Sequence, residues 1–107
     1  DSITSDSTTN VNVDFYHDAQ GDLTSGANTI GIGNVTSAYS STSSSSGFSS
    51  ESALSTTYTA LCTNVAAGDT CWMKYYIDYP SNVAAGTYTT TYEYCAVETG
   101  QGSGACT

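Results

Sequence analysis

Residues 71–94 read CWMKYYIDYPSNVAAGTYTTTYEY and include the only Trp, Met, Lys and Pro of the chain and six of its nine tyrosines. Every second side chain from position 73 to position 79 is large and apolar, and every second one from position 88 to position 94 is Tyr or Thr. A period of two in aromatic and β-branched residues is typical of β-strands. The stretch therefore predicts two strands joined by one turn.

The turn in this stretch occurs twice, because the NVAAG of residues 82–86 also stands at residues 64–68. Its Asn can hydrogen-bond the nearby backbone, and its Gly can take a positive φ just before the next strand begins. The repeat predicts a meander in which strands 54–62, 70–79 and 87–97 pair in chain order.

The remaining sequence adds further strand signals and no helical spacing of apolar residues. Strands are predicted at residues 10–17 and 29–35, with weaker ones at both ends of the Ser-rich segment 36–52. We expect an all-β fold, a single antiparallel β-sandwich of the Ig-like or jelly-roll kind with about seven to eight short strands. It spans residues 1–107 as one domain, with the polar residues 1–10 as a donated or flexible N-terminal arm.

The charge balance excludes several partners. The net charge is −9, with one Lys and no Arg, so no basic patch exists for nucleic acid. No apolar run is long enough to predict a transmembrane segment. Four cysteines, the scarcity of Lys and the lack of an initiator Met predict a processed chain that is secreted, extracellular or on the cell surface.

The four cysteines can form two disulfides in three ways. The favoured pairs are Cys62–Cys71 and Cys95–Cys106, because both are local and staple loose segments without long-range closure. The alternative joins Cys71 to Cys95 and leaves Cys62 for Cys106. A zinc site needs closer CxxC-type spacing than this chain offers.

No constellation of residues predicts catalysis, a cofactor or a metal. His17 has no nucleophile in a recognisable setting such as GxSxG, so the chain is predicted not to be an enzyme. Asp14, Asp18 and Asp22 lie four residues apart, which leaves calcium as an alternative to a solvated acidic turn, although the EF-hand pattern is absent.

Two further acidic residues, Asp78 and Glu93, are predicted either to pair across the 71–94 hairpin or to be exposed near Lys74. Five aromatic residues are candidates for a sugar-stacking platform, although a packing face explains them better. These residues are Trp72, Tyr76, Tyr88, Tyr92 and Tyr94.

Glycosylation is predicted at Asn34, because Asn34-Val35-Thr36 is the only N-glycosylation sequon of the chain. The serines of residues 40–46 permit O-linked sugars as well.

The segment 79–94, YPSNVAAGTYTTTYEY, resembles the final hairpin of many bacterial and archaeal secreted β-sandwich domains, including pilin-like, spore-coat and WxL-type surface modules. The segment 30–35, IGIGNV, resembles an element that often opens such domains. The resemblance implies a surface or filament subunit, and its motifs are structural, so no functional residue is carried over. The chain lacks the long apolar N-terminal helix of type IV pilins.

We therefore expect a structural subunit of an extracellular filament, pilus or surface assembly. Its partner is a second copy of the chain, bound head to tail through donation of the N-terminal strand to the sheet edge of its neighbour. The alternative is a secreted carbohydrate-binding or adhesin module that uses Trp72 and the surface tyrosines.

Overall fold

Nine short β-strands and two 3-10 helices make up the computed structural model, which describes residues 1–106. The strands are β1 (Ser2–Thr4), β2 (Val13–Ala19), β3 (Leu23–Ser25), β4 (Asn28–Ile30), β5 (Val35–Ser40), β6 (Ser52–Ala53), β7 (Thr59–Ala60), β8 (Thr70–Ile77) and β9 (Tyr92–Glu98). The 3-10 helices are η1 (Ile32–Asn34) and η2 (Ser103–Cys106).

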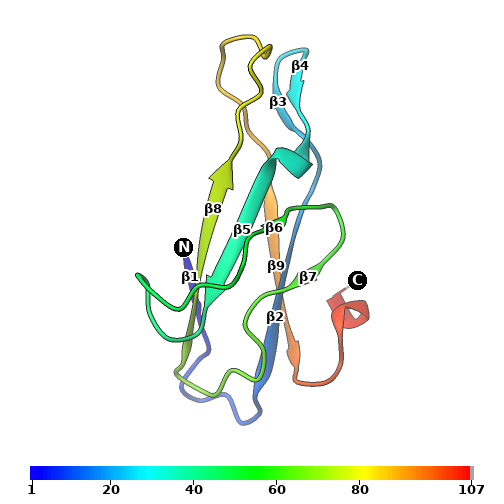
Figure 1. The fold of residues 1–107 in the computed structure, drawn as a ribbon. Helices are drawn as coiled ribbons and strands as arrows, with labels where there is room; N and C mark the ends of the chain where they lie inside the picture. The colour runs from blue at the N-terminus through cyan, green and yellow to red at the C-terminus, as the bar shows by residue number, and fades with distance from the viewer. Residues whose placement is uncertain (107) are drawn as a thin grey trace.

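Two antiparallel sheets form a sandwich, with strand orders β1-β8-β5-β6 and β7-β2-β9. In Figure 1, β8 and β5 lie in front of β2 and β9, and the separate hairpin β3-β4 lies at the top. The predicted all-β antiparallel sandwich is confirmed. The described residues contain nine strands, more than the seven to eight expected, because several are only two or three residues long.

The predicted meander is wrong. Strands β7, β8 and β9 follow one another along the chain, yet β8 belongs to one sheet and its neighbours in sequence to the other. Both NVAAG segments therefore cross between sheets and do not turn hairpins. Residues 71–94 are two strands as predicted, but β8 pairs with β1 and β5, while β9 pairs with β2.

The two NVAAG segments also differ in conformation. Gly68 has φ +82°, as predicted, and Asn64 is left-handed as well with φ +54°. Gly86 has no positive φ, and here a side chain is disfavoured by lack of space. A Cβ at this position would lie 2.6 Å from Ser25 Oγ, so the 82–86 segment relies on the close approach of β3.

Segment 29–35 is not one strand. The chain leaves β4 after Ile30, passes through η1, and enters β5 at Val35. Beyond β5, the Ser-rich segment folds back, and the Lys74 ammonium lies 4.3 Å from the centre of the Phe48 ring. This contact places Phe48 against the outer face of β8.

The interior consists of two apolar clusters. One contains Phe15, Leu61, Cys62, Val65, Cys71 and Met73, and the other contains Ala19, Leu23, Ile30, Val35 and Leu54. Alternation in β2 points Phe15 into the first cluster and Ala19 into the second. Tyr75 packs against both clusters, so it stands at the boundary between them.

Two disulfides staple this fold, Cys62–Cys71 and Cys95–Cys106, which are the two local pairs favoured from the sequence. Cys71 is fully buried, and its bond to Cys62 connects β8 to the segment that follows β7 in the opposite sheet. Cys106 fastens η2 to β9. The first disulfide therefore joins the two sheets, and the second holds the C-terminal segment.

The N-terminal arm lies on the edge of its own sheet. Ser2, Ile3 and Thr4 pair with residues 70–72 of β8, and the Thr4 and Thr70 hydroxyl oxygens are 2.8 Å apart. Ser5 continues the attachment, because its N–H donates to Asp69 O at 2.9 Å. The ladder on this side of β8 ends near Met73, whose N–H donates to Asp1 O.

Candidate functional site

A chain of polar side chains crosses the sandwich at the boundary between the two apolar clusters. His17, which is 3% exposed, lies 3.0 Å through its Nδ1 from the Tyr75 hydroxyl. The Tyr75 hydroxyl is in turn 2.8 Å from the Tyr94 hydroxyl, which donates to Asp1 Oδ2 at 3.4 Å. Ser37 Oγ lies 3.5 Å from His17 Nε2 and completes the chain. This path of polar side chains joins strands of both sheets to the N-terminus.

The two buried titratable groups of this hydrogen-bonded path, His17 and Tyr75, are held in their neutral forms. Burial lowers the pKa of His17 below its ordinary 6.5, because a charged imidazolium is poorly solvated in the interior. Burial, followed by the hydrogen bond to Tyr94, raises the pKa of Tyr75. His17 and Ser37 are nearly fully buried, so this pair meets no substrate from solvent and serves as a structural connection.

A second polar cluster lies on the opposite face of β2, where Asp18 stands directly across from Glu93 of β9. Glu93 Oε1 accepts hydrogen bonds from Gln20 Nε2 and, at 3.4 Å, from the Tyr58 hydroxyl. Asp18 is only 6% exposed, and its Oδ1 is buried without a hydrogen-bond partner among the described residues. Two carboxyl groups therefore share one site.

The surroundings of Asp18 favour its protonated form. Burial raises its pKa most, and the neighbouring Glu93 carboxylate adds repulsion and a hydrogen bond that favours the acid form. A hollow of about 230 Å³ adjoins Asp18. Its lining consists of Asp18, Thr56, Thr57, Tyr58, Ser103 and Gly104.

Asp14 lies on the same face of β2 as Asp18, but both of its carboxylate oxygens accept hydrogen bonds. Its Oδ1 accepts from the Asn64 N–H at 2.7 Å and the Thr99 hydroxyl at 2.9 Å, and its Oδ2 accepts from the Gly100 N–H at 3.2 Å. The pKa of Asp14 is lowered, chiefly by the bond from Asn64. Asp14 therefore fastens the segments after β7 and β9 onto β2.

The three aspartates that left calcium as an alternative do not converge on one site. Asp14 binds backbone and Thr99, Asp18 faces Glu93, and Asp22 Oδ1 accepts from the Ile32 N–H at 2.9 Å. Within residues 1–106, no group of three or more His, Cys, Asp or Glu side chains is placed to hold a metal ion. Of the two alternatives for Asp78 and Glu93, the pair does not form, because Glu93 lies across from Asp18 while Asp78 follows β8 in the other sheet. Both side chains are exposed, as the second alternative predicted.

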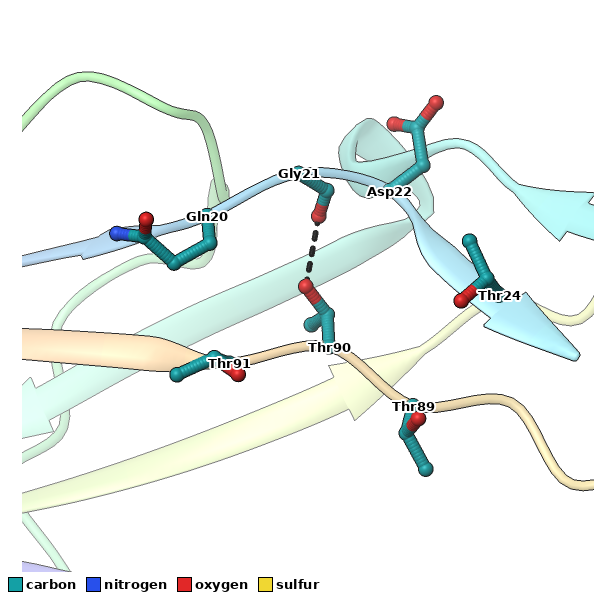
Figure 2. Close-up of a pocket in the computed structure, with 7 residues that line it drawn as sticks. All are labelled: Gln20, Gly21, Asp22, Thr24, Thr89, Thr90 and Thr91. Atoms are coloured by element: carbon teal, nitrogen blue, oxygen red, sulfur yellow. Dashed lines mark hydrogen bonds between the residues drawn. The ribbon is translucent and has the colours of Figure 1, made fainter.

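A larger groove of about 450 Å³ runs between residues 20–24 and 89–91. Figure 2 shows the two segments side by side, with the Thr90 hydroxyl donating across to the Gly21 carbonyl at 2.8 Å. The pairing resumes where Thr24 and Thr89 exchange backbone hydrogen bonds. Threonine hydroxyls and the single carboxylate of Asp22 line the groove, which offers no nucleophile with an adjacent base.

The five aromatic candidates do not share a surface. Trp72 and Tyr76 alternate with the buried Cys71 and Met73, so they lie on the outer face of β8. Tyr92 stacks on Tyr75 between the sheets with ring centroids 4.8 Å apart. Tyr94 also reaches inward to Tyr75, and Tyr88 donates to Ala84 O within the 78–91 connection.

The Asp18–Glu93 pair was missed from the sequence, because 74 residues lie between the two positions in the chain. Only the register of β2 against β9 brings them together. The spacing of the aspartates made Asp18 a candidate ligand, but nothing in the sequence identified Glu93 as its neighbour.

Asn34, the predicted glycosylation site, lies in η1 and is half-buried. Its Nδ2 donates to Gly31 O at 3.2 Å. No helix among the described residues is long and apolar enough to cross a membrane.

Comparison with known proteins adds no relative. No family model, curated protein or solved structure matches the chain.

Proposed function

We propose that the chain is a structural subunit of an extracellular filament, pilus or surface assembly, in which each copy donates its N-terminal strand to the next. The observation that carries the proposal is the pairing of β1 with β8. This pairing is made by backbone groups at a sheet edge, and a neighbouring copy can make the same pairing.

The attachment of β1 is small enough to exchange. Three residue pairs hold it to β8, and Ile3 is its one apolar side chain packed against the core. An arm supplied by another copy forms the same hydrogen bonds and buries Ile3 in the same place. The exchange therefore conserves the contacts, and its cost is confined to the connection that must open.

That connection is residues 6–12, which contain no strand and are largely exposed. Thr8 N–H and the Thr9 N–H both bond back to Asp6, so the segment now turns locally. If it straightens, β1 moves away from its own β8. When each copy donates its arm to a different neighbour from the one whose arm it accepts, the contact is head to tail and propagates, whereas reciprocal exchange between two copies closes as a dimer.

The rest of the fold suits a durable subunit of this kind. Two disulfides stabilise small domains in oxidising compartments, and they hold both the sandwich and the C-terminal segment. With 10 acidic residues against one Lys, surface charge favours dispersal of subunits until a specific contact forms.

Cross-linking at Thr4 and Thr70 tests the proposal, because these side chains already touch and the four native cysteines are all in disulfides. We expect a Thr4→Cys chain mixed with a Thr70→Cys chain to form cross-linked pairs, which only arm exchange permits. The doubly substituted chain should give a ladder on non-reducing gels, and negative-stain images should show filaments.

Three controls make the test decisive. Each single variant alone should give no cross-linked dimer, and a chain without residues 1–10 should give no filaments. Filaments that persist without residues 1–10 contradict strand donation. A purely intramolecular cross-link in the double variant, with monodisperse particles in the images, contradicts the filament function itself.

A further inference from the structure

Within residues 1–106, no positively charged group neighbours the Asp18–Glu93 pair, and the N-terminal ammonium is bonded to Met73 O. The chain has one Lys, one His and no Arg. Lys74 lies over Phe48 on the other sheet, and His17 points to the opposite face of β2 because neighbouring strand residues alternate. The buried Asp18 carboxyl, which is 6% exposed, therefore lies beside the exposed Glu93 carboxylate, and a shared proton or a bound cation would offset their repulsion.

The second observation is the unsatisfied oxygen. Asp18 Oδ1 is buried without a hydrogen-bond partner in the described part of the chain, although buried acceptors normally have one. Asp18 also lines the 230 Å³ hollow. A water molecule occupies about 30 Å³ of liquid, so this space admits an ion together with several waters.

The other residues around the hollow supply the right kind of atom. Thr56, Thr57 and Ser103 each carry a hydroxyl, and the Tyr58 hydroxyl already reaches Glu93. No cysteine sulfur or imidazole lines the hollow, which disfavours zinc and other metals that prefer nitrogen or sulfur ligands.

We propose that a calcium ion binds at this hollow, held by Asp18 in its wall and by Glu93 directly across from Asp18 on β9, with the surrounding hydroxyls and waters completing the oxygen shell. Calcium accepts six to eight oxygens in flexible geometry, whereas magnesium demands a tight octahedron. The segments around the ion are β2, residues 56–58 and η2, so calcium fastens the C-terminal 3-10 helix to the sandwich beside its disulfide.

Thermal unfolding of the full chain, with and without CaCl2, tests the site. Extracellular modules bind calcium with Kd of about 0.1–1 mM, so 10 mM CaCl2 should raise Tm by roughly 5–10 °C at pH 7.5. NaCl at matched ionic strength should not raise it. Calorimetric titration with CaCl2 should give one site per chain.

Matched variants locate the effect. Asp18→Asn and Glu93→Gln should each abolish the calcium-dependent rise in Tm, whatever they do to Tm in the absence of the ion. Asp14→Asn removes another buried carboxylate four residues away and should retain the full rise. The proposal fails if the wild type shows no heat and no rise in Tm, in which case the pair shares a proton only. It also fails if Asp18→Asn responds to calcium as the wild type does.

Discussion

Acidification below pH 6.5 should destabilise the sandwich through His17. In the unfolded chain the imidazole takes up a proton as the pH falls through about 6.5. In the folded chain burial lowers its pKa, so it remains neutral to lower pH. The unfolded state then binds more protons than the folded state, and the free energy of unfolding falls with decreasing pH.

The magnitude follows from the linkage relation. Between pH 6.5 and the folded-state pKa, the loss approaches about 1.4 kcal/mol per pH unit. From pH 7.5 to 5.5 it sums to about 1.4 kcal/mol if the folded imidazole stays neutral throughout. The groups that face His17 are Ser37, Tyr75 and Tyr94, and burial raises the pKa of Tyr75, so its hydroxyl stays neutral in this range.

Urea unfolding at pH 7.5, 6.5 and 5.5, followed by Trp72 fluorescence, measures the loss. Asp18 acts in the opposite direction, because its raised pKa lets the folded state gain a proton first as the pH falls toward 3.8. The comparison is therefore made in an Asp18→Asn background, where His17→Asn removes the imidazole and keeps a polar group near Tyr75. Equal pH dependence with and without His17 would refute the reasoning.

Three further outcomes are expected. Replacing both Cys62 and Cys71 by Ala should lower the free energy of unfolding, measured in urea, by about 2.5 kcal/mol, because the unfolded chain gains loop entropy. Removing the Cys95–Cys106 disulfide should mainly raise the rate of amide hydrogen exchange in η2. Asp14→Asn should lower the free energy of unfolding by about 1–3 kcal/mol at pH 7, because three hydrogen bonds lose their charged acceptor. The difference in this free energy between wild type and variant should shrink as the pH falls below 3.8. Mass spectrometry of the chain from an exporting, glycosylating host should show a glycan that Asn34→Gln removes, and an unmodified mass would contradict the assignment of that sequon.

Alternation predicted which residues face the interior better than it predicted which strands are neighbours. In β8 the sequence places Met73 and Tyr75 on one face and Trp72 and Lys74 on the other, and burial follows that division. Burial does not follow it to the end of the stretch, because Ile77 and Tyr79 are 50% and 49% exposed. A period of two identifies a face, but it is the same whether the next strand pairs beside it or lies in the opposite sheet.

The disulfides show the same limit. Cys62–Cys71 was favoured as a staple across a hairpin, and the pair forms although no hairpin exists. A short connection brings two cysteines together whether it reverses within one sheet or crosses to the other. Proximity in sequence predicted the bond, but it could not predict that the bond joins two sheets.

The polar chain through His17 explains how a sandwich can close with so few aliphatic residues. Leu, Ile, Val and Phe number only 15, too few to form one continuous core over molecular dimensions of 48 × 31 × 20 Å. Tyr75 and Tyr92 fill the boundary between the two apolar clusters with stacked rings, and their polar ends must then be satisfied inside the protein. His17 and Tyr94 satisfy Tyr75, and Asp1 accepts the last hydrogen bond at the surface. The N-terminal arm therefore closes a hydrogen-bonded path that begins in the core, so exchange of that arm between copies must reproduce the Asp1 contact as well as the pairing of β1.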